Sequence, residues 1–163
     1  MSEEKINREE LYYILMSSWI YSIEKTRKEL LGENIAYTKR IGWNATEYIL
    51  DHLKNKCDLG INKGNSLKTL KNIIKCLEDM DFIKKGCIHV EKNVNTLSIE
   101  ITGCKAEACK DLINKGITPQ VCLRSIILDT LLEYATGQEY TYKLKADPSN
   151  QPDGICITYL DEL

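Results

Sequence analysis

The hydrophobic pattern of the chain changes its period about halfway along, and this change limits the folds that the chain can form. Over about residues 7–82, apolar side chains recur every three or four positions, which is the spacing of one helix face. From about residue 83 onward, segments with alternating apolar and polar residues, as in half-buried strands, are mixed with further helical segments. The pattern therefore predicts a helical part over about residues 7–82 and an α+β part over about residues 83–161.

Capping and turn residues set the expected limits of the elements. Ser66 and Thr118 suit the N-cap position, Pro119 suits the first position of a helix, and Gly137 suits a helix end, whereas Gly42 is expected to kink or divide a helical stretch. Helices are expected over Arg8–Leu31, about Ile35–Lys54, Ser66–Met80, Ala106–Asn114 and Pro119–Thr136, and strands over Cys87–Val90, Leu97–Thr102, Tyr140–Ala146 and Ile155–Leu160. This order predicts one α+β domain over residues 1–163, in which N-terminal helices pack on an antiparallel sheet of about four strands with two further helices.

Composition excludes several classes of protein. A hydrophobic share of 43% with 28% charged residues is ordinary for a globular domain. The net charge of −2 argues against a general nucleic-acid binder, which usually carries a basic excess. No apolar run approaches the roughly 18–20 residues that span a membrane, and the polar, acidic start at residues 1–5 is unlike a secretory signal. We therefore expect a cytoplasmic protein without a membrane partner.

Seven cysteines are the residues most informative about function. Because the count is odd and cytoplasmic thiols stay reduced, a disulfide framework is not expected. Cys57 and Cys76 are expected to fill the core, and Cys87 is an ambiguous case that could act as a substitute ligand. The other four cysteines form a C-x4-C-x12-C-x33-C series in the second half of the chain, at Cys104, Cys109, Cys122 and Cys156.

The alternation of side chains along the strands favours metal binding by these four cysteines over simple core packing. On the strand over residues 97–102 the alternate apolar residues share one face, so Cys104 is expected on the other face. On the last strand, alternate apolar residues likewise leave Cys156 on the opposite face, and Cys122 lies in line with two acidic residues of its helix. Four thiolates are a common ligand set for structural zinc. Buried thiols that fill a second core layer are the alternative, and the spacing alone slightly favours it.

Other residue constellations are less specific. Aromatic residues gather in the first third of the chain, and Tyr12, Trp19 and Trp43 could line a pocket for an apolar ligand. A plain core or a dimer interface is the alternative for these aromatic side chains. The chain has no Ser/His/Asp arrangement that we can identify and no dinucleotide-binding fingerprint. The sequence therefore gives little reason to expect an enzyme.

Four stretches of the second half carry a family resemblance: Ile101-Thr102-Gly103-Cys104, Thr118–Leu123, Leu131–Gly137 and Asp153-Gly154-Ile155-Cys156-Ile157. In these stretches the chain resembles the 4-vinyl reductase domain family, which is also described as a small-molecule-binding domain. The last turn is shorter by one residue than the Gly-Asp-x-x-Cys-like turn of the family, and reordered. The match covers about residues 83–161.

The resemblance implies a ligand-binding fold that is shared with TRAPP transport-complex subunits and haem nitric-oxide-binding domains. It also implies a hydrophobic small-molecule ligand and a metal site. Carried over to this chain, the metal ligands are Cys104, Cys122 and Cys156, with Cys109 as the added fourth, and zinc is the first candidate for a set of thiolates. The family name mentions a reductase activity, but this sequence contains no cofactor-binding motif that would support it.

The sequence leaves more than one function open. The first is a small-molecule-binding or sensing domain, homodimeric, with a cysteine-bound zinc ion. The alternative is a winged-helix-like DNA-binding regulator, since residues 44–102 are expected to form helix, loop, helix and hairpin, and residues 39–92 hold 11 basic and 7 acidic residues. Lys68, Lys71 and Lys75 would then face phosphates, but their helix has no Arg for reading guanine, so nucleic acid is the less favoured partner. A reductase-pathway enzyme and a scaffold subunit are weaker alternatives.

Overall fold

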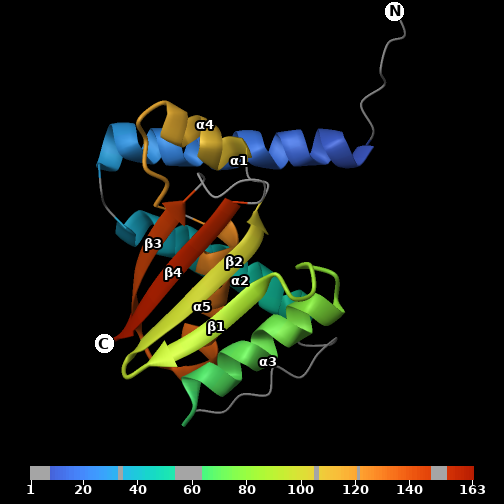
Figure 1. Ribbon diagram of the computed structural model, residues 1–163, viewed down its shortest axis with the longest axis vertical. Helices are drawn as coiled ribbons and strands as arrows, with labels where there is room; N and C mark the ends of the chain where they lie inside the picture. The colour runs from blue at the N-terminus through green and yellow to red at the C-terminus, as the bar shows by residue number, and fades with distance from the viewer. Residues whose placement is uncertain (1–7, 33–34, 54–63, 105–106, 121, 148–153) are drawn as a thin grey trace, which may run out of the picture.

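In the computed structural model, which describes residues 8–32, 35–53, 64–104, 107–120, 122–147 and 154–163, helices and strands follow one another in the predicted order. The elements are α1 (Arg8–Leu31), α2 (Ile35–Leu53), α3 (Ser66–Asp79), β1 (Ile88–Asn93), β2 (Thr96–Cys104), α4 (Glu107–Asn114), α5 (Leu123–Thr136), β3 (Tyr140–Asp147) and β4 (Gly154–Glu162). The strands form one antiparallel sheet in the order β1-β2-β4-β3 (Figure 1). The predicted α+β class is confirmed.

α5 is the central helix of this fold. All of its residues from Ser125 to Glu133 are buried, because α2 and α3 both pack on it and it also contacts β3. In Figure 1, α2 and α5 lie behind the sheet, whereas α1 and α4 lie across the upper end of the sheet. Leu97, Ile99 and Ile101 of β2 are fully buried in the same core as the apolar residues of α3 and α5.

Gly42 allows α2 to pack closely on α5. The helix runs through Gly42 without a break, although a glycine inside a helical pattern often marks an interruption. A Cβ atom at this position would lie 2.6 Å from Cγ1 of Ile126 and 3.1 Å from Cγ2 of Thr130. The buried Thr130 hydroxyl also contacts the hydroxyl of Thr46 on α2. The close approach of the two helices therefore explains the glycine.

α3 begins with a different cap from the predicted one. Asn65 is the N-cap, and its side chain accepts a hydrogen bond from the N–H of Lys68 at 2.9 Å. Ser66 is instead the buried first residue of the helix, and its hydroxyl donates to Glu162 at 3.1 Å. The serine thus fixes α3 to the end of β4.

α5 also begins later than predicted, at Leu123 rather than at Pro119. The N–H of Gln120 donates to the Glu24 carboxylate of α1 at 3.0 Å, and the N–H of Cys122 donates to the Tyr142 hydroxyl of β3 at 3.2 Å. These two contacts with other elements hold Gln120 and Cys122, and Cys122 has an extended backbone, although the residues before it suit a helix start. Cys122 is therefore the N-cap of α5, and not a residue inside the helix.

The β1–β2 hairpin is part of the sheet and does not project as a wing. β2 pairs with β1 on one side and with β4 on the other, so it is an inner strand. α3 packs on α5 and β1. Lys68, Lys71 and Lys75 are exposed on α3. The hairpin, however, does not have the position that the winged-helix alternative requires.

Candidate functional site

Cys156 lies on the buried face of the sheet. On β4 the buried residues are Gly154, Cys156, Thr158 and Leu160, whereas Ile155, Ile157 and Tyr159 are only half-buried. Cys156 pairs with the fully buried Ile101 of β2, and residues opposite each other on neighbouring strands share a face. The prediction that Cys156 would lie away from the core face is therefore wrong. The alternation of side chains correctly divides β4 into two faces. The helices, however, cover the face that carries Cys156, which is the less apolar of the two.

A bulge near the end of β2 changes the expected position of Cys104. The pairing is regular up to Ile101 opposite Cys156, and the next pair is Cys104 opposite Gly154, so β2 has one more residue than β4 in this interval. Gly103 lies within the bulge with a φ of +68°, a left-handed conformation that favours glycine. Simple alternation from Ile101 therefore does not apply to Cys104. The register places its backbone opposite Gly154 and two residues from Cys156, and its side chain lies outside what the structure describes.

Cys122 lies above the same face of the sheet. As the N-cap of α5 it has no side-chain capping hydrogen bond, and its N–H donates to the hydroxyl of Tyr142. Tyr142 is a buried residue of β3, and four residues further along that strand Ala146 pairs with Cys156. Burial raises the pKa of the Tyr142 hydroxyl well above its usual value, and the nearby Cys122 adds to this rise. The start of α5 is thus fixed to the buried side of β3.

The remaining cysteines have different environments. Cys109 is half-buried on α4, which begins three residues after Cys104. Cys87 is half-buried directly before β1, and its carbonyl oxygen accepts a hydrogen bond from the N–H of Thr102 at 2.8 Å. Cys76 is buried on α3, as predicted, but it is disulfide-bonded, so the expectation of thiols alone is wrong at this position. Cys57 lies outside the described residues.

Cys109, Cys122 and Cys156 are thiols in this structure. Within the part of the chain that the structure describes, no group of three or more His, Cys, Asp or Glu side chains is placed to hold a metal ion. Cys109, Cys122 and Cys156 belong to this part of the chain, so these three side chains do not by themselves surround one metal position. The structure brings the backbone of Cys104 next to β4 and brings Cys122 to the buried side of β3.

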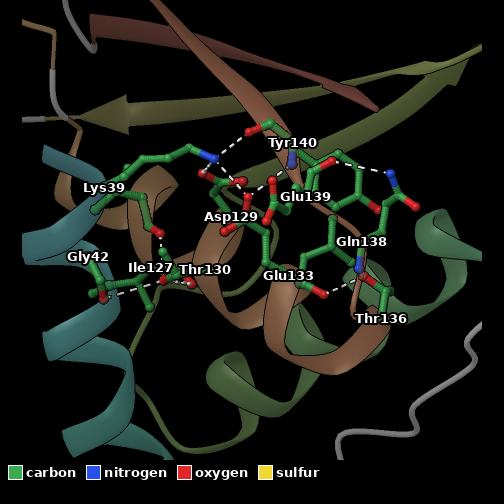
Figure 2. Close-up of polar contacts among 12 residues, drawn as sticks. Lys39, Gly42, Ile127, Asp129, Thr130, Glu133, Thr136, Gln138, Glu139 and Tyr140 are labelled. Carbon is green, nitrogen blue, oxygen red and sulfur yellow. Dashed lines mark hydrogen bonds and ion pairs between the residues drawn. The ribbon is translucent and has the colours of Figure 1, made fainter. Parts of the chain in front are cut away.

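Two buried carboxylates of α5 share one lysine of α2 (Figure 2). The Nζ atom of Lys39 lies 2.7 Å from Oε1 of Glu133 and 3.4 Å from Oδ2 of Asp129, and it also donates to the backbone oxygen of Tyr140. The same Glu133 oxygen accepts a hydrogen bond from the N–H of Tyr140 at 2.9 Å. This buried ion cluster joins α2, α5 and the start of β3.

Asp129 is the unusual member of the ion cluster. Its side chain is fully buried, and neither carboxylate oxygen has a hydrogen-bond partner among the described residues. Burial raises its pKa from 3.8 to about 7, opposed by the charge of Lys39 and assisted by the charge of Glu133. With both carboxylates ionised, the cluster would hold a net negative charge in the core. Two acidic residues inside the apolar run of α5 are the sequence signal that marks this cluster.

The aromatic residues predicted to line a pocket lie in different surroundings. Trp19 of α1 is mostly exposed, and Trp43 of α2 is half-buried. The side chain of Tyr12 is not among those that the structure describes. The aromatic pocket therefore stays a prediction.

No protein-family model matches this chain, and no curated protein matches it. The resemblance of the second half to the 4-vinyl reductase domain family therefore stays a prediction. Among the described helices, none is long and apolar enough to cross a membrane. The function has to be argued from the residues of the site itself.

Proposed function

We propose that the protein is a small-molecule-binding or sensing domain whose site is built around a zinc ion held by Cys104, Cys109, Cys122 and Cys156. The observation that carries this proposal is the bulge at Gly103. Because of the extra residue, the backbone of Cys104 lies opposite Gly154, two residues along β4 from the buried Cys156. Cys122, the N-cap of α5, lies on the buried side of β3, the strand beside β4.

The donor set suits zinc. Cys156 is buried and Cys109 and Cys122 are half-buried, so their thiolates would be poorly hydrated and a bound cation would stabilise them. The N-terminus of α5 carries the positive end of the helix dipole, which favours a thiolate at Cys122. Four thiolates bind zinc in a closed tetrahedral site, and the loss of one ligand would open a coordination position to a small molecule.

Tyr142 would position one of these ligands. Its hydroxyl accepts the hydrogen bond from the N–H of Cys122 and so fixes the first turn of α5 against the sheet. Removing a group that orients a metal ligand typically lowers metal affinity by about 10–100-fold. Tyr142 therefore belongs to the proposed site without touching the metal.

The polar part of a ligand has candidate partners beside the cysteines. The hydroxyls of Ser125 and Thr158 are buried and, within the described part of the chain, have no hydrogen-bond partner. Ser125 lies one turn after Cys122 on α5, and Thr158 lies two residues after Cys156 on β4. Buried polar atoms of this kind are normally satisfied by water, an ion or a ligand. We assign them to the polar group of an otherwise apolar ligand.

Native mass spectrometry of the protein, purified with a reductant that does not bind metal, tests this function. We expect one zinc ion per chain, lost or strongly reduced in Cys104→Ser and Cys156→Ser. Cys87→Ser is the matched control, since this half-buried thiol lies outside the proposed set, and it is expected to retain zinc. A wild-type protein without stoichiometric zinc contradicts the proposal. Equal loss in Cys87→Ser and Cys156→Ser contradicts the assignment of ligands.

A further inference from the structure

α5 carries a row of polar side chains inside the core, which we call the polar face of α5: Cys122, Ser125, Asp129 and Glu133. Steps of three, four and four residues keep these side chains on one side of the helix. At one end, the N–H of Cys122 donates to the Tyr142 hydroxyl of β3 at 3.2 Å. At the other end, Glu133 accepts a hydrogen bond from the N–H of Tyr140, also of β3. The polar face therefore lies against the sheet, where such a helix usually places apolar residues.

Tyr142 and Thr158 bring two hydroxyl groups from the sheet to this face. Thr158 of β4 is fully buried and pairs with Leu144, two residues from Tyr142 on β3, so both hydroxyls belong to the buried side of the sheet. Burial is the main cause of the raised pKa of the Tyr142 hydroxyl, and Thr158 and the charge of Asp129 also affect it. The two hydroxyls and the Asp129 carboxylate therefore belong to one buried region.

Three side chains of this region have oxygen atoms without a hydrogen-bond partner among the described residues: Ser125, Asp129 and Thr158. All three are fully buried. An ionised carboxylate can only accept hydrogen bonds, and a hydroxyl can accept one as well as donate its own. Three accepting side chains match the three N–H donors of a primary ammonium group.

The charges of the region favour a cation over a neutral donor. Asp129 and Glu133 share Lys39, whose Nζ atom lies 3.4 Å from the first carboxylate and 2.7 Å from the second (Figure 2). With both carboxylates ionised, this cluster carries one more negative charge than positive charge. A buried charge without a counter-charge is costly, and a single ammonium group would balance it.

The polar face also runs from the partly exposed start of α5 into the core. Cys122 is half-buried, whereas Ser125 and Asp129 are fully buried. A head group that enters from the Cys122 end reaches Ser125 first and Asp129 about one turn further on. An ammonium group has about the size of a water molecule, so beside Asp129 it needs a space of only that size. The apolar part of the ligand would then lie nearest to the cysteines.

We propose that the ligand of this domain is an amphiphilic primary amine whose ammonium group binds Asp129, with Ser125 and Thr158 as further acceptors. This inference rests on the proposed small-molecule-binding function and names the chemical class of the ligand. It does not depend on bound zinc, because none of the three residues is a proposed zinc ligand. An alcohol of the same chain length would leave the buried negative charge unbalanced, and a carboxylate would add to it.

Isothermal titration calorimetry at pH 8, where Asp129 is mostly ionised, tests the proposal with hexylamine, 1-hexanol and hexanoate, which share one chain length. We expect hexylamine to bind about tenfold tighter than 1-hexanol, because hydrogen bonds to charged groups are stronger than neutral ones, and hexanoate to show no measurable binding. Equal binding of all three probes, tightest binding of hexanoate, or no binding of hexylamine overturns the proposal. Ammonium chloride that binds as tightly as hexylamine would assign the site to an inorganic cation and overturn the choice of an amphiphilic amine.

Matched variants test the assigned residues. Asp129→Asn keeps the shape of the side chain and removes its charge, so hexylamine should bind this variant about as weakly as 1-hexanol binds the wild type. Thr130→Val is the control, because it removes a buried hydroxyl of the same helix that contacts Thr46 of α2 instead of the sheet, and it should bind hexylamine like the wild type. A preference for the amine that survives in Asp129→Asn, or an equal loss in both variants, overturns the assignment.

The amine and the zinc ion can be refuted separately. A wild-type protein that retains zinc in native mass spectrometry but binds hexanoate best would keep the proposed function and overturn the amine. A protein that binds hexylamine through Asp129 but retains no zinc would support the amine and contradict the proposed zinc site.

Discussion

Replacing Asp129 by asparagine should make the protein more stable at alkaline pH. Asparagine has nearly the shape of a protonated aspartate but cannot take up the buried negative charge. The folded-state pKa of Asp129 is raised from 3.8 to about 7, mainly by burial. The native state therefore binds this proton more tightly than the unfolded state, and the resulting stability is lost as pH rises through about 7. The shift corresponds to roughly 4 kcal/mol in total.

The difference in the free energy of unfolding between Asp129→Asn and the wild type isolates this effect, since all other titrating groups are common to both. Measured by urea denaturation, the difference should change in favour of the variant by roughly 2–3 kcal/mol between pH 5 and pH 8. Asp111→Asn, at an exposed position of α4, is the control for the loss of a carboxylate outside the ion cluster. A difference for Asp129→Asn that does not change between pH 5 and pH 8 would refute the argument that the ion cluster holds a proton near neutral pH.

Three further predictions concern other contacts. Gly42→Ala should lower the free energy of unfolding by about 1–3 kcal/mol, because its Cβ meets Ile126, although alanine favours helices; an unchanged urea midpoint would count against this. Arg27→Met should lower it by about 3–5 kcal/mol, because Glu24 is left buried without its cation, and a loss below about 1 kcal/mol would contradict the buried pair. Tyr142→Phe should weaken zinc retention against a chelator by about 10–100-fold, whereas retention equal to wild type would remove Tyr142 from the site.

The order of the elements could be predicted because each rests on local signals. Apolar spacing marked the helices, alternation marked the strands, and Gly137 ends α5 in the left-handed conformation expected of a helix-terminal glycine. Gly42 carried a signal as well, but the sequence does not show whether such a glycine bends a helix or allows a close contact. The answer depends on Ile126, which is 84 residues further along the chain.

The candidate site was harder to predict because it depends on contacts between distant elements. Alternation divides β4 into two faces, but the position of α5 decides that the Cys156 face is the buried one. Counting from Ile101 does not reach Cys104 reliably, because one extra residue in β2 interrupts the regular alternation between them. The start of α5 was displaced by hydrogen bonds to Glu24 and Tyr142, which no local pattern reveals.

The orientation of α1 shows the same limit. Its periodicity predicts an apolar face, and the usual expectation is that such a face packs on the core. The structure buries Glu24 and Arg27 instead and leaves Trp19 and Leu30 exposed. A single sequence cannot distinguish a face that covers the core from a face that meets another molecule, because both need the same residues.

X-ray absorption spectroscopy at the zinc edge is the most direct test of the proposed site. If Cys104, Cys109, Cys122 and Cys156 hold the ion, the first coordination shell should fit four sulfur atoms at about 2.3 Å. Cys156→Ser should lower the fitted sulfur number or remove the metal. A wild-type shell made mainly of nitrogen or oxygen atoms at about 2.0 Å, or a protein that retains no zinc, would contradict a four-cysteine site.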